Sequence, residues 1–414
     1  PSFRSYPALP SPPRSIHFAP GYNVTTHIIP ASHPRQSFLE PRRHSQLEPK
    51  RERQAWAIDT ASKLRGKRAA LRKLCAKNHD SGVLKDPQQE LPVPVLWNVV
   101  NRYARVGAPK EKKDIGIIVV VAHSNGFHKE VWESTIKHLI SFVARPSTGI
   151  HIDEIWSIDA VNSGDSALLN EKYLGDVFDW IDHARDVLNL VEDFIPEGPF
   201  VASTQPLPVH LDRVSSECSH GAGSLASVAC ANPNIFHSIT LVEPIIFPEP
   251  NSRADSFVMG SLLRRPSWSS RKEAKAHFLR NPTFNVWAPE ILDLYIQYGL
   301  VDIPPSDGAA LSCVFFFFPQ EAVCFADDFF EKETYEMLEE LDEKVKIKWI
   351  MARGPLEGRT ADLTQATVWR RPVNSTNVKI NSSHLVCPAN LFVMCNPLPT
   401  LDHVDCPGGA SGSW

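Results

Sequence analysis

A run of eight mostly β-branched apolar residues at 115–122, "IGIIVVVA", constrains the fold of this chain more than any other feature. An unbroken run of this length is expected of a strand that is buried on both faces of a parallel sheet. A polar turn containing a glycine follows at 123–130, and a segment with helical periodicity follows at 131–144. Strand, turn and helix in this order predict one βα unit of an α/β protein.

The alternation of strands and helices continues along the chain. A helical pattern occupies 180–195, and a small-residue helix is expected after residue 219. Further strands are expected at 22–29, 95–106, 152–159, 238–243, 345–351 and 376–380. The pattern predicts an α/β fold with a mostly parallel central sheet and helices on both faces.

The segments between these units suggest how the chain is divided. Residues 1–20 are rich in Pro, Ser and Arg and are expected to form a disordered leader. The first part of the core is expected at 21–246 and contains a basic insertion at about 41–94. The second part of the core is expected at 343–386, after an interruption at 247–342. That interruption is rich in helical, Trp-bearing stretches, which predict an inserted helical cap or lid. Residues 387–414 have many turn residues and predict an irregular tail.

Composition narrows the class of protein. The net charge of -4 gives no global reason to expect a nucleic-acid partner. No apolar run reaches the roughly 20 residues that a membrane-spanning helix needs. The 8 cysteines show no CxxC pair, and no secretory signal is visible, so an intracellular location with reduced thiols is expected, either cytoplasmic or organellar. The oligomeric state is left open.

The basic insertion has two interpretations. It is rich in Lys and Arg between Pro41 and Lys77. The preferred interpretation is a solvated segment that contains a cationic helix, and the alternative is a contact with an anionic partner.

Ser219 occupies a small-residue stretch, "SSECSHGAG", that leads into the expected helix. A serine on a tight turn between strand and helix forms a nucleophile elbow, whose strained backbone lifts the hydroxyl above the sheet. Gly221 stands at position +2, as such a turn requires, but Glu217 stands at −2, where a small residue is usual. Taken alone, this stretch favours a plain glycine-rich turn.

The turn at 123–126, "HSNG", follows the buried strand 115–122. Ligands of open α/β sheets bind at the carboxyl ends of the strands. Backbone N–H groups in such a turn, with Asn125 as the candidate, can stabilise a developing oxyanion. Gly126 would support the turn, and His123 is expected to brace the loop by hydrogen bonds.

His384 follows the last expected strand, so it is placed at the same edge of the sheet. A histidine there can take the proton from a serine nucleophile and return it to the leaving group. Two carboxylates could orient the imidazole. Glu243 closes the strand 238–243 among apolar residues and is preferred, while Glu357, after the strand 345–351, is the alternative.

With these residues in place, the chain resembles the α/β-hydrolase superfamily, and within it the fungal toxin-biosynthesis proteins and peroxisomal lipase-like hydrolases. The segments that carry the resemblance are 24–35, 122–133, 157–191, 232–246, 285–300 and 367–386. The resemblance implies a serine hydrolase that cleaves an ester or thioester of a lipophilic acyl compound without a metal or an organic cofactor. It also makes a peroxisomal location possible, although no C-terminal address is seen.

The resemblance also implies roles for single residues. Ser219 matches the nucleophile and His384 the base, while Glu243 matches the acid. The backbone amides of Asn125 and His220 match the oxyanion hole, and 247–342 would be the lid that shapes the acyl pocket. The departure at Glu217 supports an alternative, in which the chain is an inactive α/β-hydrolase scaffold with a binding role or the product of a defective gene model.

Overall fold

The computed structural model describes the chain in several stretches. These are residues 6–12, 14–33, 35, 50–81, 95–107, 115–145, 150–195, 212–218, 220–249, 254–303, 312–315, 318–327, 329–352 and 361–380. Ser219, Glu357 and His384 lie outside them, as do the expected leader up to residue 5 and the expected tail at 387–414.

The strands form one large and one small sheet within these residues. The strands are β1 (His17–Ala19), β2 (Tyr22–Pro30), β3 (Trp97–Arg105), β4 (Ile115–Ala122), β5 (Ile150–Ile158), β6 (Asp212–Cys218), β7 (Ser238–Val242), β8 (Ser267–Trp268), β9 (Leu300–Ile303), β10 (Ser312–Phe315), β11 (Lys346–Ala352) and β12 (Ser375–Ile380). The large sheet has the order β1-β2-β3-β5-β4-β6-β7-β11-β12.

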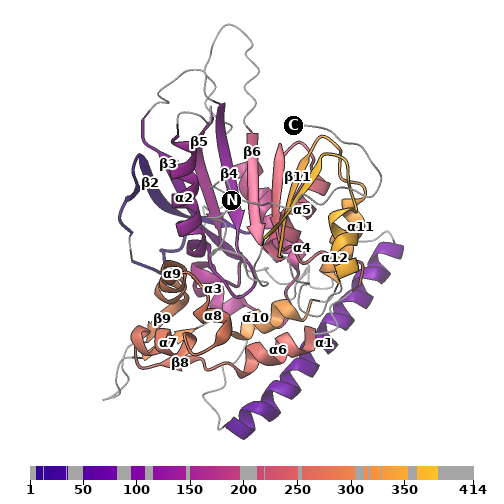
Figure 1. Cartoon of the computed structure of the whole chain (residues 1–414). Coiled ribbons are helices and arrows are strands. Elements are labelled where there is room, and N and C mark those ends of the chain that lie inside the picture. Colours follow the sequence, from indigo (N-terminus) through magenta and orange to yellow (C-terminus); the bar gives the residue numbers. More distant parts are fainter. Residues whose placement is uncertain are drawn as a thin grey trace.

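The helices lie around and between these strands. They are α1 (Lys50–Ser81), η1 (Lys129–Trp132), α2 (Glu133–Val143), α3 (Gly164–Asn170), η2 (Glu171–Tyr173), α4 (Trp180–Asn189), η3 (Leu190–Phe194), α5 (His220–Ala231), α6 (Ala254–Leu263), α7 (Arg271–Phe278), α8 (Pro282–Asn285), α9 (Pro289–Gly299), α10 (Phe318–Phe325), α11 (Phe330–Leu338) and α12 (Ala361–Val368). Figure 1 shows the large sheet at the centre, with the elements from α6 to α10 gathered at one end of it.

The predicted α/β fold with a mostly parallel sheet is confirmed. From β5 through β4, β6, β7 and β11 to β12 each neighbouring pair is parallel, while β1, β2 and β3 add an antiparallel edge that reaches β5. The residues of β4 alternate between two hydrophobic clusters. One cluster includes α2 and α9, and the other includes α4 and α5. This burial on both faces explains why the β4 sequence has no polar side (Figure 1).

The strand that leads to Ser219 forms in spite of its polar sequence. The segment before Ser219 is interrupted by prolines, and β6 begins after the last of them. It pairs in parallel with β4 on one side and β7 on the other, with Glu217 opposite Ala122 and Leu241. Hydrogen bonds to both neighbouring strands satisfy the backbone N–H and C=O groups of β6. Pairing within the sheet therefore stabilises a strand that its local sequence does not favour.

The basic insertion contributes a helix that is packed, not merely solvated. Ala57, Ala61 and Leu64 form a buried stripe of α1, with exposed fractions of 0%, 0% and 1%. This stripe belongs to a cluster that also contains Val258 and Leu262 of α6. Figure 1 shows α1 lying along α6 at the periphery of the molecule.

The basic side chains that follow this stripe are engaged with carboxylates of the same chain. Arg68 is buried and bonds Asp179 at 3.0 Å and Asp327 at 2.6 Å. Lys67 bonds Asp176 at 3.0 Å. In the described part of α1, these charges serve internal contacts and do not favour the alternative of a contact with an anionic partner.

The region 247–342 contains more than the expected helices. Besides α6 to α10, it holds the small antiparallel sheet with the order β8-β10-β9. Its last helix, α11, packs on α5 of the core, where the ring of Phe330 lies against Gly223. A Cβ at Gly223 would lie 2.5 Å from that ring, so the glycine permits the close approach of the two helices.

Candidate active site

Three neighbouring parallel strands end at one edge of the sheet, each before a candidate site residue in the sequence. β4, β6 and β7 are neighbours, and they end at Ala122, Cys218 and Val242. The segments that follow them begin with the 123–126 turn, Ser219 and Glu243. Because parallel strands end at the same edge, the 123–126 turn and Glu243 lie at the edge where β6 also ends.

A single residue separates β6 from α5. The strand ends at Cys218 and the helix begins at His220, so Ser219 is the one residue of the sequence between them. Gly221 lies buried in the first turn of α5, and the helix remains buried as far as Ala229 because small residues dominate it. A nucleophile elbow needs a strand and a helix that follow each other at this spacing on either side of its serine.

His220 is fixed at the start of α5 by aromatic contacts. Its ring stacks on Trp180 at 4.7 Å with an interplanar angle of 22°. The same ring makes a T-shaped contact with Phe325 of α10, with the ring centroids 5.9 Å apart. The first residue of a helix leaves its N–H outside the intrahelical ladder, which is why its amide is a candidate donor to an oxyanion.

The 123–126 turn is held from two sides. The Phe127 N–H donates to Ser124 O at 3.1 Å, and Gly126 has a φ of +79°, which favours glycine. The Asn125 side chain donates to the backbone oxygen of Glu321 in α10 at 3.1 Å. Among the described residues nothing accepts a hydrogen bond from the Asn125 backbone N–H, so it is available as the second candidate donor.

His123 lies fully buried at the base of this turn. Its Nδ1 lies 2.8 Å from Ser124 O, and its Nε2 accepts from the Ala160 N–H at 3.1 Å. Burial lowers the pKa of His123 to about 3, so the ring stays neutral. The 3.9 Å approach of Asp159 to its Nε2 is therefore not an ion pair at neutral pH.

Glu243 follows β7 directly and has an unusual backbone. Its φ is +45°, which is rare for a residue with a long side chain and is found mainly at strained functional positions. The side chain is buried, with 1% of the residue exposed, and its Oε1 accepts from the Ala352 N–H at 2.7 Å. The carboxylate is thus fixed between the ends of β7 and β11, on the side of the sheet where β12 follows.

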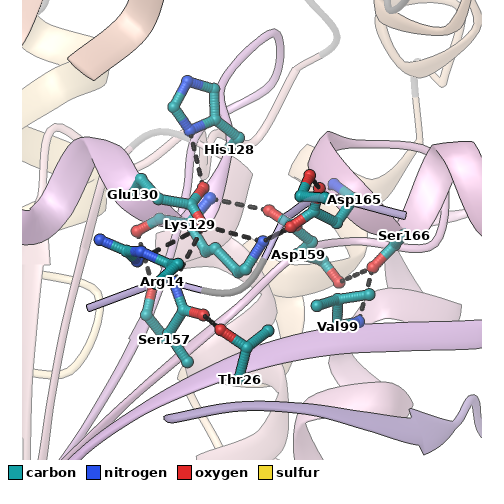
Figure 2. Close-up of polar contacts among 12 residues, drawn as sticks. Arg14, Thr26, Val99, His128, Lys129, Glu130, Ser157, Asp159, Asp165 and Ser166 are labelled. Atoms are coloured by element: carbon teal, nitrogen blue, oxygen red, sulfur yellow. Dashed lines mark hydrogen bonds and ion pairs between the residues drawn. The ribbon is translucent and has the colours of Figure 1, made fainter. Parts of the chain in front are cut away.

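A buried charge cluster anchors the helix that follows the 123–126 turn. The Lys129 Nζ is fully buried and lies 2.8 Å from Asp159, 2.8 Å from Asp165 and 2.9 Å from Glu130 (Figure 2). The Lys129 N–H also donates to Asp159 at 2.7 Å. Burial alone would lower the pKa of Lys129, but the three carboxylates raise it well above its ordinary value.

The cluster extends to the N-terminal part of the chain. Arg14 forms a close ion pair with Glu133, and Figure 2 shows its guanidinium beside Glu130. Burial raises the pKa of Asp159 to about 7, while Lys129 opposes that rise. These ionic contacts fix η1, and through η1 they fix the turn that carries Asn125.

Sequence reasoning missed this cluster and a second buried histidine. Asp159 directly follows β5, and that strand-end position was the signal that could have marked it. His183 in α4 is fully buried, with its ring 6.3 Å from that of His123. Neither of its ring nitrogens has a hydrogen-bond partner among the residues that the structure describes.

Replacement of His183 by leucine is expected to protect the protein against acid. Burial lowers the pKa of His183 to about 4, with Asp186 opposing and Arg35 reinforcing the shift. Because the unfolded imidazole takes up a proton near pH 6.5, the wild type loses about 1.4 kcal/mol of stability per pH unit between pH 6.5 and 4 through this group. The variant lacks this loss, so its advantage grows to about 2 kcal/mol at pH 5.

Urea unfolding of both proteins from pH 4 to 8.5 measures this difference. The difference in free energy of unfolding between variant and wild type should be constant above pH 7.5, which serves as the internal control. A difference that is also constant between pH 6.5 and 4.5 would contradict a neutral buried imidazole.

Comparison with solved structures identifies the class of fold. The chain has the α/β-hydrolase fold: it superposes on the peroxisomal α/β-hydrolase Lpx1 of Saccharomyces cerevisiae with a TM-score of 0.62 and 18% identity, over 91% of this chain and 87% of that chain. The expected resemblance to this superfamily is confirmed. No family model matches the chain.

Sequence comparison then identifies relatives over shorter stretches. The chain is 35% identical over 130 residues to the peroxisomal membrane protein LPX1 of Saccharomyces cerevisiae, which is 31% of this chain and 30% of that protein. It is 30% identical over 166 residues to the type I acyl-CoA thioesterase mpaH of Penicillium brevicompactum, which is 39% of this chain and 35% of that protein. The chain thus spans about a third of the length of these two relatives.

In the described ranges, no group of three or more His, Cys, Asp or Glu side chains is arranged to hold a metal ion. The same part of the chain contains no helix with both the length and the apolar character needed to cross a bilayer.

Proposed function

We propose that this protein is a serine hydrolase that cleaves an ester or a thioester of a lipophilic acyl compound. The observation that supports the proposal is that three neighbouring strands end at one sheet edge: β4 before the turn of Asn125, β6 one residue before α5, and β7 before the strained, buried Glu243. The similarity to an acyl-CoA thioesterase supports the choice of an acyl substrate.

The mechanism assigns one step to each group. Ser219 attacks the carbonyl carbon while His384 takes its proton, and Glu243 holds His384 and stabilises its charged form. The amides of Asn125 and His220 stabilise the tetrahedral oxyanion. His384 then protonates the leaving alcohol or thiol, and a water molecule activated by His384 releases the acid from Ser219.

The region 247–342 would act as the lid over this site. The ring of Phe127, directly after the 123–126 turn, lies 5.5 Å from that of Trp287, which precedes α9, and 5.6 Å from that of Tyr295 in α9. Aromatic side chains at this place favour an acyl group over a polar one. An organellar location like that of the yeast relative is part of the same proposal.

The inactive scaffold is the second candidate, and Glu217 is the feature that favours it. A bulky residue two positions before the serine obstructs the usual nucleophile elbow. Labelling by a fluorophosphonate probe separates the two functions, because the probe reacts covalently with an activated serine and needs no knowledge of the substrate.

The proposed function predicts that the wild type is labelled and that Ser219→Ala and His384→Ala abolish labelling. Ser141→Ala, at an exposed serine of α2, is the matched control and should be labelled like the wild type. A folded wild type that is never labelled would establish the inactive scaffold. Labelled wild type would next be tested for thiol release from acyl-CoA thioesters of increasing chain length.

A further inference from the structure

Helix α10 contacts two residues of the candidate site and its surroundings. Its backbone oxygen at Glu321 accepts from the Asn125 side chain, and its Cys324 oxygen accepts from Trp180 Nε1 at 3.4 Å. Trp180 is the residue on which His220 stacks. One helix of the region 247–342 therefore touches the supports of both candidate oxyanion donors.

The carboxylate of Glu321 lies against the 123–126 turn itself. A Cβ placed on Gly126 would be 2.9 Å from Glu321 Cδ and 3.1 Å from each of its carboxylate oxygens. The Glu321 side chain is only 4% exposed, so water screens its charge weakly. Gly126 is thus needed for two reasons, its positive φ and the space that this carboxylate fills.

This placement creates an electrostatic problem for the proposed chemistry. An oxyanion that forms at the Asn125 amide would develop negative charge close to a buried carboxylate. Two like charges separated by several ångströms in a poorly screened site repel strongly enough to affect a reaction rate. The site can work well when another group neutralises Glu321.

Arg264 is that group. It follows the last residue of α6, and its Nη1 donates to Glu321 Oε2 at 2.6 Å. Burial lowers the pKa of Arg264 and Glu321 raises it, with a net rise, so the guanidinium remains charged. The pair joins α6 to α10 directly above the turn.

We propose that Arg264 is a positioning residue for the reaction: it neutralises Glu321 and holds α10 on the oxyanion turn, so that the amide of Asn125 acts without a competing negative charge. This inference rests on the proposed serine hydrolase function. It goes beyond that function because it assigns a role in catalysis to a pair outside the triad and the oxyanion hole.

Arg264→Met tests the inference through the rate of fluorophosphonate labelling and through kcat on an ester. We expect the rate of labelling and kcat to fall by about 10- to 100-fold, with little change in KM, because an uncompensated charge opposes the transition state more than substrate binding. Arg265→Met is the matched control. Arg265 is the neighbouring arginine, it is exposed, and its ion pair is with Glu273, at 2.8 Å, and not with a residue of the turn. The control should leave both rates unchanged.

The double variant Arg264→Met with Glu321→Gln separates charge from structure. The second substitution removes the uncompensated charge and keeps the size of the side chain, so most of the lost rate should return, to within about 3-fold of wild type. Arg264→Lys, which keeps the charge and is the safer variant for folding, should also remain within about 3-fold of wild type.

Each outcome bears on the inference. Equal rates for Arg264→Met and Arg265→Met would overturn it, and so would a slow double variant or a slow Arg264→Lys, because these results would indicate a structural role. A folded wild type that is never labelled would overturn the proposed function and this inference together, whereas a labelled wild type with an insensitive Arg264 overturns the inference alone.

Discussion

In the proposed serine hydrolase, replacement of Glu243 by glutamine is expected to lower kcat by about 10³- to 10⁴-fold, because an amide would not stabilise the charged imidazole of His384. Glutamine has the size of glutamate and can still accept the hydrogen bond from the Ala352 N–H. The variant is therefore expected to fold, and the loss should appear in turnover and not in stability. Steady-state kinetics on an ester, together with a thermal unfolding curve, measure the two effects separately.

Glu357→Gln is the matched control for this prediction. Glu357 follows β11 in the sequence and is the alternative acid, while Glu243 is the proposed acid, whose Oε1 accepts from the Ala352 N–H. The control should retain activity to within about 3-fold of wild type, as expected for a substitution outside the triad. A large loss in Glu357→Gln with an active Glu243→Gln would show that the acid was assigned to the wrong residue.

Replacement of Lys129 by methionine is expected to lower the free energy of unfolding by about 3–5 kcal/mol at pH 8, because it leaves buried carboxylates without their cation. Asp159, Asp165 and Glu130 all lie within 2.9 Å of its Nζ. Burial already raises the pKa of Asp159 and Lys129 opposes that rise, so without Lys129 the pKa of Asp159 rises further. Its carboxyl group is then neutral at low pH and carries an uncompensated buried charge at high pH, so stability is lost as pH rises. The destabilisation should therefore be larger at pH 8 than at pH 5.

Urea unfolding at both pH values checks this prediction. Lys63→Met is the matched control, because Lys63 forms an exposed ion pair with Asp59 on α1. Such a pair contributes at most about 0.5 kcal/mol. If the two variants lose equal stability, or if the loss at Lys129 is independent of pH, the buried cluster does not have the role assigned to it.

The sequence predicted the central part of the fold well, since that part depends on local patterns. The apolar run of β4 and the helical periodicity of α4 were recognised because each residue's neighbours in sequence determine its face. The positions of Asn125 and Glu243 followed from the same reasoning, because a residue directly after a parallel strand must lie at the carboxyl edge of the sheet. The roles of these residues remain predictions.

The contacts that the sequence did not reveal join segments far apart in the chain. Arg68 and Asp327 are 259 residues apart, and Asn125 and Glu321 are 196 residues apart. No periodicity links such partners, so the basic segment suggested a solvated helix when its central part is buried. The small sheet of β8, β9 and β10 escaped notice for the same reason.

The sequence by itself thus determined the class of fold and the edge of the sheet at which chemistry can occur, because hydrophobic periodicity and strand ends are local properties. Only the tertiary structure decided how charge is balanced there. Whether Lys129 is stable when buried, and whether Glu321 opposes or tolerates an oxyanion, depends on which distant side chain lies within about 3 Å, since electrostatic energies in a poorly solvated site change steeply with distance.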